Sequence, residues 1–168
     1  ALTLDRQLLA ELLGEGELRD LLDPDEFASV ELELQRLTDD RRARDADEVA
    51  DLLRVLGPLS VAEVDARSTG LDAAAVLEGL VATRRTIPLR VGGQARFAAI
   101  EDAARLRDAL GIQPPQGVPD VFLEPVDDPL GDVVGRFART HGPFTTAEAA
   151  EALGLPAAVV DQTLHRLA

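Results

Sequence analysis

Arginine side chains grouped around one short segment are the residues of this chain best suited to a chemical role. Arg84, Arg85, Arg90 and Arg96 lie at the end of an expected helix and along an expected two-stranded hairpin. A guanidinium group presents planar N–H donors that match the oxygens of a phosphate. We therefore predict that this segment is the surface best able to bind a nucleic-acid backbone. The alternative is a solvated face on which these arginines form local salt bridges.

Two further polar side chains lie on the last expected helix of the chain. Gln162 and Arg166 occupy this helix close to Ala168. Both residue types contact phosphates or base edges in nucleic-acid complexes. They complete the set of predicted nucleic-acid contacts.

Sequence patterns for catalysis or metal binding are absent. The chain has no cysteine and two histidines, and it contains neither a glycine-rich phosphate loop nor an HExxH motif. His141 is expected at the C-terminal end of a helix, where a partly charged imidazole is favourable, and His165 is expected to be solvated. We therefore predict no catalytic residue, no metal site and no cofactor in this chain.

The net charge opposes the obvious ligand of a basic surface. The formal charge is −14 at pH 7, which repels a phosphate backbone and weakens salt-dependent, non-specific binding. All 17 basic residues are arginine, and lysine and asparagine are absent, which indicates a GC-rich genome of the actinobacterial kind. No membrane-length apolar stretch and no signal-peptide pattern occurs, so we expect a cytoplasmic protein without a membrane partner.

The elements that would position the arginines occur twice. Residues 49–84 read VADLLRVLGPLSVAEVDARSTGLDAAAVLEGLVATR, and residues 134–168 read VGRFARTHGPFTTAEAAEALGLPAAVVDQTLHRLA. The matched positions are Gly57 and Gly142, Pro58 and Pro143, Ser60 and Thr145, Glu63 and Glu148, and Gly70 and Gly154. Each copy predicts a helix, a Gly-Pro stop, a short helix that begins with a capping box and ends at a glycine, and a second helix. This order is the helix-turn-helix plan.

The first copy continues into a predicted wing. Residues 86–91 and 94–100 have strand patterns around Gly92 and Gly93, which predicts a β-hairpin. A helix-turn-helix followed by such a hairpin is a winged helix, and a helix at 101–110 follows it. The second copy stops at Ala168 without a wing, so we expect the chain to be a fragment of a longer protein.

The second long helix of the first copy favours packing over base recognition. Beside its apolar stripe it offers acidic and small side chains, namely Asp72, Ala75, Glu78, Gly79 and Ala82. None of these can make the bidentate contacts by which Arg reads guanine or Asn reads adenine. Small side chains on a helix face instead permit the close approach of a neighbouring domain.

The remaining segments are expected to be connectors. Helices are predicted at 4–13 and 24–37, the latter with Asp23 as N-cap. Leu8, Leu9, Leu12, Leu21, Leu22, Val30, Leu34 and Leu37 form an apolar stripe that requires a cover. A charged linker is predicted at 39–44, a proline linker at 113–119, a short extended piece at 121–123, and a helix N-cap at Asp128.

The predicted fold is mainly α (α+β), with tandem winged-helix or helix-turn-helix units, one short β-hairpin wing and a preceding helical segment. Its predicted parts are a helical connector (1–45), a first winged-helix domain (46–111), a proline-containing linker (112–128) and the helix-turn-helix of a truncated second winged-helix domain (129–168).

Four longer stretches carry a resemblance to a known family. They read GELRDLLDPDEFASVELELQRL, RRARDADEVADLLRVLGPLSVAEV, RFAAIEDAARLRDALGI and VDDPLGDVVGRFARTHGPFTTAEAAEALGL. The chain resembles the large helicase-related (Lhr) family of bacterial superfamily 2 helicases, in the region of tandem winged helices past the helicase core. The arrangement is also similar to that of AlkZ-type DNA glycosylases, but their Gln-x-Gln motif is absent, so no glycosylase residue is carried over.

The resemblance implies a parent protein that uses ATP and Mg²⁺ to translocate 3′ to 5′ on single-stranded DNA and to unwind it in DNA repair. For this chain we expect a non-catalytic accessory region that contacts other domains of the parent and, through the arginines, single- or double-stranded DNA. The alternatives are an interdomain or self-association scaffold without DNA contact, and a winged-helix transcription regulator. The acidic charge and the small-residue helix face favour the scaffold.

Overall fold

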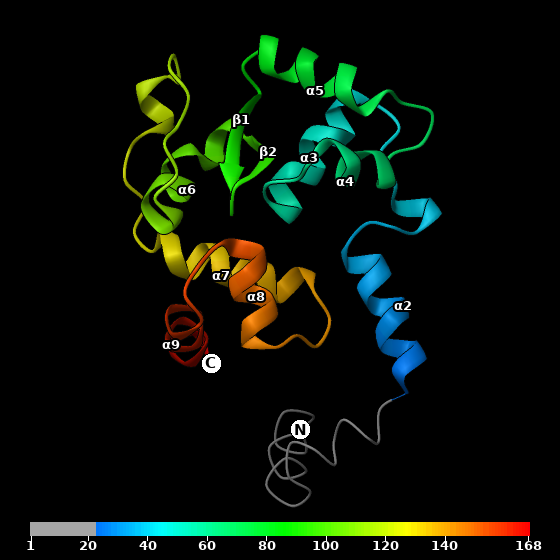
Figure 1. The fold of residues 1–168 in the computed structure, drawn as a ribbon. Coiled ribbons are helices and arrows are strands. Elements are labelled where there is room, and N and C mark those ends of the chain that lie inside the picture. Colours follow the sequence, from blue (N-terminus) through cyan, green and yellow to red (C-terminus); the bar gives the residue numbers. More distant parts are fainter. Residues whose placement is uncertain (1–22) are drawn as a thin grey trace, which may run out of the picture.

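The computed structural model describes residues 23–168 and is mainly helical, with one two-stranded antiparallel hairpin (Figure 1). The predicted fold class is thereby confirmed. The elements are α2 (Pro24–Leu34), η1 (Asp39–Arg41), α3 (Ala46–Leu56), α4 (Val61–Ala66), α5 (Ala73–Ala82), β1 (Thr86–Val91), β2 (Gln94–Ala99), η2 (Ile100–Asp102), α6 (Ala103–Leu110), η3 (Asp120–Phe122), α7 (Pro129–Thr140), α8 (Thr146–Leu153) and α9 (Ala157–Leu167). The helix predicted at 4–13, with the first five leucines of the apolar stripe, lies outside the described residues.

Helices α3, α4 and α5 form the first helix-turn-helix around an aliphatic core. Val49, Leu53, Val64 and Leu77 are fully buried there. Helix α3 ends at Leu56, directly before the Gly-Pro pair. The amphipathic spacing of these side chains is what folds the three helices onto one another, because burying them removes apolar surface from water.

Both predicted capping boxes are present. The Ser60 hydroxyl accepts a hydrogen bond from the Glu63 amide while the Glu63 carboxylate accepts one from the Ser60 amide. Thr145 and Glu148 make the same pair of bonds at the start of α8. The repeat therefore specifies the start of each short helix in the same way.

One predicted helix end is wrong in the first copy. Helix α4 ends at Ala66, before Gly70, whereas Gly154 does cap α8 in the left-handed conformation. The cause is a parallel β-bridge between Ala43 and Ser68. In it Ala43 donates to the Arg67 carbonyl at 2.8 Å and accepts from the Thr69 amide at 2.9 Å, which draws the chain out of the helix. Ala43 is consequently buried, although the sequence predicted a charged linker there.

The wing forms as predicted. Strands β1 and β2 pair from Thr86 with Ala99 to Val91 with Gln94. Gly92 and Gly93, the two residues between them, have φ values of 56° and 80°. A two-residue turn with positive φ at both positions matches the twist of the flanking strands and is adopted most easily by glycine.

Helices α7, α8 and α9 form the second helix-turn-helix. Asp128 caps α7 by accepting from the Gly131 amide, with Pro129 in the first turn, as predicted. Ala149 and Val160 are fully buried in its core, against which Phe137 and Phe144 pack. The two rings meet edge to face at 5.0 Å between centroids.

Two connectors differ from the sequence predictions. Helix α2 ends at Leu34 rather than at residue 37, because Arg36 adopts a left-handed φ of 58°. The amides of Arg36 and Leu37 then bond back to the carbonyls of Glu33 and Leu32, which is the Schellman pattern of a helix end. The piece predicted to be extended at 121–123 belongs instead to the 3-10 turn Asp120–Phe122, which Pro119 closes by accepting from the Phe122 amide.

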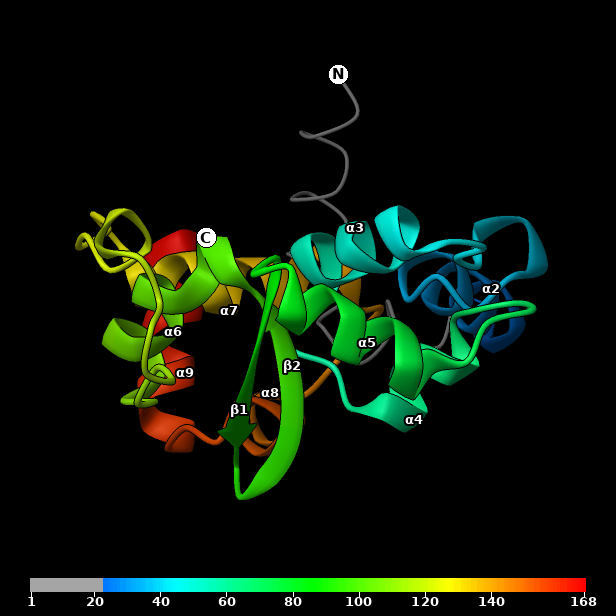
Figure 2. The same cartoon turned by 90° about the horizontal axis from the view of Figure 1, so that it is seen from above.

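The second unit packs under the first. Helix α7 contacts α6, α3 and the end of α2, and α9 packs on α7 from the other side. Figures 1 and 2 show α6 and the hairpin lying over α7 and α8, with α2 extending away at the edge. Among the described helices, none is both long and apolar enough to cross a bilayer.

Candidate functional site

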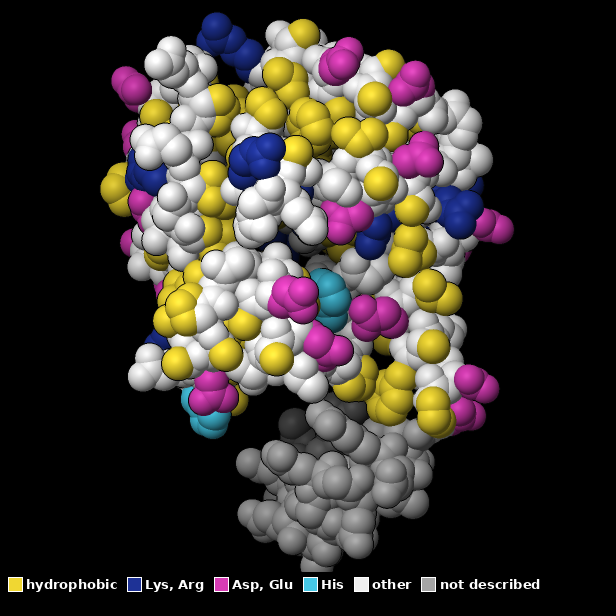
Figure 3. Space-filling model, viewed as in Figure 1, with side chains coloured by type: hydrophobic (Ala, Val, Ile, Leu, Met, Phe, Trp, Pro, Cys, Tyr) yellow, Lys and Arg dark blue, Asp and Glu magenta, His cyan; other side chains and the backbone are white. Residues whose placement is uncertain are grey.

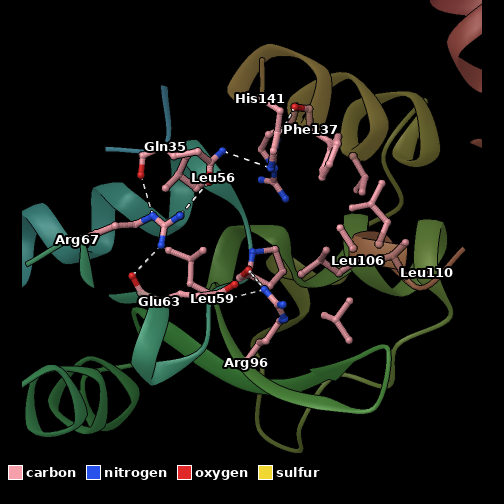
Figure 4. Close-up of a pocket in the computed structure, with 16 residues that line it drawn as sticks. Gln35, Leu56, Leu59, Glu63, Arg67, Arg96, Leu106, Leu110, Phe137 and His141 are labelled. Carbon is pink, nitrogen blue, oxygen red and sulfur yellow. Dashed lines mark hydrogen bonds and ion pairs between the residues drawn. The ribbon is translucent and has the colours of Figure 1, made fainter. Parts of the chain in front are cut away.

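The junction between the two helix-turn-helix units encloses a small cavity of about 120 Å³. Figure 4 shows side chains entering it from the end of α2, from the first unit and from α7. Its lining combines aliphatic side chains with a few charged and polar ones, including Gln35, Glu63, Arg67, Arg96 and His141. The surface view is also hollowed near the middle of the molecule (Figure 3).

Gln35 connects the two units across this cavity. It is 9% exposed, and its side-chain amide donates to the Thr140 carbonyl at the end of α7. The same nitrogen lies 3.4 Å from Nε2 of His141. On the other side its carbonyl Oε1 accepts from Nη2 of Arg67 at 2.9 Å. One glutamine therefore satisfies polar groups of both helix-turn-helix units.

Arg67 is a buried cation held by neutral oxygens. It donates to the backbone carbonyls of Gln35 at 2.7 Å and Glu63 at 2.9 Å, in addition to Gln35 Oε1. Burial lowers the pKa of the Arg67 guanidinium from its ordinary value, and the nearby charge of Glu63 opposes that shift. Burying this charge is tolerated only while its hydrogen bonds are intact, because an unsatisfied buried charge costs free energy.

His141 closes the cavity against α7. Its ring stacks on Phe137 with 3.7 Å between centroids, and its Nδ1 lies 2.9 Å from the Phe137 carbonyl. The imidazole is thus at the end of helix α7, where the sequence predicted it. His165 is exposed, with Nδ1 near the carbonyl of Asp161 at 2.9 Å.

A second contact between the units is a nearly buried ion pair. Arg136 of α7 donates at 2.6 Å to Asp102, the last residue of η2 in the first winged helix, and their side chains are 12% and 5% exposed. Arg105 also donates to Asp102 and reaches Asp132 of α7 at 3.0 Å. Two arginines and two aspartates consequently bridge α6 and α7, with Asp102 at the centre.

The wing is part of this junction instead of projecting into solvent. One face of the hairpin, with Ile87, Leu89, Val91 and Ala98, is buried in a cluster that also contains Val133 of α7. Leu153 of α8 packs against the same cluster. A separate cluster of buried side chains therefore joins the wing and α6 to α7 of the second unit.

The tip of the wing contacts the turn of the second helix-turn-helix. A Cβ atom added at Gly154 would lie 3.2 Å from the amide nitrogen of Gly92 and 3.3 Å from its Cα. Such distances are tighter than ordinary carbon contacts, so the two backbones meet here because neither residue has a side chain. The repeat predicted Gly154 as a turn residue, and the structure adds this close approach.

The six predicted nucleic-acid residues do not form one surface with free charges. Arg85 pairs with Asp47 at 2.6 Å. Arg96 pairs with Glu63 at 2.9 Å, donates to the Pro58 carbonyl, and is 17% exposed. Arg90 donates to the Gly93 carbonyl at 2.6 Å. Arg84 is exposed and has no ion-pair partner among residues 23–168.

The two predicted residues of the last helix lie on the second unit. Gln162 is exposed on α9. Both terminal nitrogens of Arg166 donate to the carboxylate of Asp128, the N-cap residue of α7, at 2.7 and 3.0 Å. The charge of Arg166 is therefore paired with Asp128 within the second unit. The role of all six residues in nucleic-acid binding remains a prediction.

The Arg166–Asp128 pair gives a testable titration. Hydrogen bonds from Arg166 and, to a smaller extent, from the Gly131 amide stabilise the charged Asp128 carboxylate. They hold the pKa of Asp128 below its ordinary value. A depressed pKa contributes stability above the unfolded-state pKa, and this contribution disappears as the pH falls through the folded-state pKa. We expect Arg166→Gln to raise the pKa of Asp128 in a carboxyl ¹³C NMR titration. An unchanged pKa would mean that the pair does not form in solution.

The residues that build the junction were missed by sequence analysis. Gln35, Arg67, Asp102 and Arg136 fall within ordinary helical or connecting segments and match no motif. For Arg67, the sequence signal that could have indicated its role is its position in the turn of the first helix-turn-helix.

Within the described part of the chain, no group of three or more His, Asp or Glu residues could hold a metal ion.

Comparisons with known proteins agree with this architecture. A family model described as "Large helicase-related protein, winged-helix domain" matches residues 20–125. A Mycolicibacterium smegmatis protein described as "Lhr helicase/ probable uracil glycosylase" is 51% identical over 168 residues, which is 100% of this chain and 11% of that protein. An Escherichia coli "Lhr helicase/uracil glycosylase" is 42% identical over 99% of the chain and 11% of its own length. The chain thus spans about one ninth of these relatives.

Proposed function

Because the chain belongs to the large helicase-related (Lhr) family, we propose that it is a non-catalytic structural region of an ATP-dependent 3′-to-5′ DNA helicase that acts in DNA repair. Its role is to hold two helix-turn-helix units in one rigid arrangement next to the other domains of the parent. ATP and Mg²⁺ belong to the helicase core of that parent, and this chain contributes no residue to their binding.

The docked wing is the observation that carries this proposal. In a winged helix that uses its hairpin to contact DNA, the hairpin must be accessible to the strand. Here one face of the hairpin is buried against α7 and α8, and its tip meets Gly154. The ion pair between Asp102 and Arg136 and the Gln35 bridge add polar contacts across the same junction. These contacts support a scaffold.

A further surface suits the packing of a neighbouring domain or a second copy. The exposed side of α5 carries small side chains, among them Ala75, Gly79 and Ala82. Figure 3 shows apolar side chains along the edge formed by α5, with acidic ones between them. This composition favours contact with protein over contact with phosphate. The proposed partners are therefore the other domains of the parent protein and a second copy of this chain.

Activity assays on the parent protein test the proposed role. We expect Gly154→Ala, which forces the wing tip away from the second unit, to lower strand unwinding while DNA-dependent ATP hydrolysis persists. The matched control is Gly70→Ala, at a glycine with φ of 71° and no atom within 4 Å of an added Cβ. Unwinding that is equally fast in both variants and in the unaltered protein would contradict a structural role. ATP hydrolysis by the isolated chain would contradict its non-catalytic nature.

A further inference from the structure

Basic side chains gather in one groove on this otherwise acidic molecule. The groove consists of two adjoining hollows of about 460 and 490 Å³. The first is lined by five arginines and one glutamate, and the second shares three of those arginines. The arginines of the groove are Arg36, Arg41, Arg42, Arg44, Arg54, Arg136 and Arg139. We call this surface the arginine groove.

The groove is assembled from separate elements. Arg36 follows α2, Arg41 belongs to η1, Arg54 to α3, and Arg136 and Arg139 to α7. Residues more than one hundred positions apart in the chain therefore meet there. A solvated charged face on one helix would not require such a convergence.

Several of these cations lack an acidic partner. Arg36, Arg44 and Arg139 form no ion pair within residues 23–168, and Arg41 has only a loose contact of 3.8 Å with exposed Asp40. Arg54 pairs with both Asp51 and Glu101, and Arg136 pairs with Asp102. Arg42 pairs with Asp39. The acids that line the two hollows are Glu33, Asp40, Glu48 and Asp51. The first hollow therefore carries an excess of positive charge in a chain whose net charge is −14.

Arg36 occupies a backbone conformation that suits glycine better. Its φ is 58°, at the Schellman position that follows a helix, where glycine is the usual residue. A side chain in this conformation costs free energy, and non-glycine residues in it cluster at functional sites. The guanidinium at this position lines both hollows.

From these observations we infer that the arginine groove binds the phosphodiester backbone of a nucleic acid. The cations extend along two joined hollows, which suits a ligand with a repeated anion, since a single phosphate or carboxylate would need only one converging pair. Apart from the arginines and acids, the lining is aliphatic or small, with Val30, Leu34, Val55 and Thr140 in the first hollow. Because no aromatic ring is available there for base stacking, the groove reads the backbone and not the sequence. This inference goes beyond the proposed function and rests on its docked arrangement, because Arg136 and Arg139 come from α7 and the other arginines from outside the second unit.

The test is fluorescence anisotropy of the 168-residue chain with a labelled oligothymidine and a labelled mixed-sequence duplex across a series of salt concentrations. We expect binding that weakens with salt. The variant R36Q/R41Q/R139Q is expected to bind more weakly, with a slope of log affinity against log salt that is flatter by about two units for the single strand, from about 0.7 per lost phosphate contact.

Two further variants separate binding from charge and folding. R84Q/R85Q/R90Q removes the same charge at the wing and leaves the groove intact, so it should retain most of the salt slope. R36G relieves the left-handed strain, so it should raise the melting temperature while weakening binding. Wild-type binding without salt dependence, an unchanged groove variant, or an equal loss in the wing variant would overturn the inference. Binding of a polyglutamate peptide in place of both oligonucleotides would also overturn it.

Discussion

Replacing Asp102 with Ala is expected to destabilise the protein by about 3 kcal/mol or more, because it leaves Arg136 as an unpaired cation at a nearly buried position. Arg136 is 12% exposed and its guanidinium lies 2.6 Å from the Asp102 carboxylate. Arg105 would lose one of its two acidic partners at the same time and keep Asp132. The free energy of unfolding, measured by urea denaturation followed by circular dichroism, gives the size of the loss.

Two comparisons distinguish a missing partner from general damage. The double variant D102A/R136M removes the unpaired charge, so it should be less destabilised than the sum of the single variants. Asp39→Ala removes an aspartate that is 96% exposed and pairs with Arg42, and we expect no measurable change from it. A D102A variant as stable as the Asp39 variant would show that the Asp102 pair contributes nothing.

Gly154→Ala is expected to lower the free energy of unfolding by about 2–5 kcal/mol, from two separate costs. The first is about 1–2 kcal/mol for an L-residue at a φ of 64°. The second is about 1–3 kcal/mol for forcing an extra carbon into a packed contact, since the new Cβ would lie 3.2 Å from the Gly92 nitrogen. The variant should also lower the amide hydrogen-exchange protection of β1 and β2 near the wing tip.

Gly70→Ala carries the first cost alone. Gly70 has a similar φ of 71°, and nothing lies within 4 Å of a Cβ added there. The difference between the two variants therefore measures the contact between the wing and the second unit. Equal destabilisation by the two substitutions would mean that Gly92 and Gly154 are not packed together in solution.

Most of the fold could be predicted because its signals are local. The capping boxes at Ser60 and Thr145 and the Gly92–Gly93 turn each depend on residues within a few positions of one another. The exceptions have non-local causes. Helix α4 ends early because the residues after it form hydrogen bonds with the backbone of Ala43. The end of α2 was missed because Arg36 adopts a left-handed conformation that glycine usually occupies.

The junction could not be predicted, because it joins residues that are distant in the chain. Gln35 and Thr140 are separated by 105 positions, and Asp102 and Arg136 by 34. Their pairing depends on how residues 112–128 direct the second unit back under the first, and the prolines in that segment indicate stiffness without direction. For the same reason the sequence placed the arginines of the wing on a candidate DNA surface, while the fold engages Arg85 and Arg96 with acidic partners.

If the scaffold role is right, the docked wing makes the two helix-turn-helix units one rigid body. Residual dipolar couplings of the backbone amides test it most directly, because they report the relative orientation of separate segments in solution. We expect a single alignment tensor to reproduce the couplings of residues 46–110 and 129–167 together. Two tensors of different magnitude or orientation would mean that the units move independently, and the scaffold account would then be wrong.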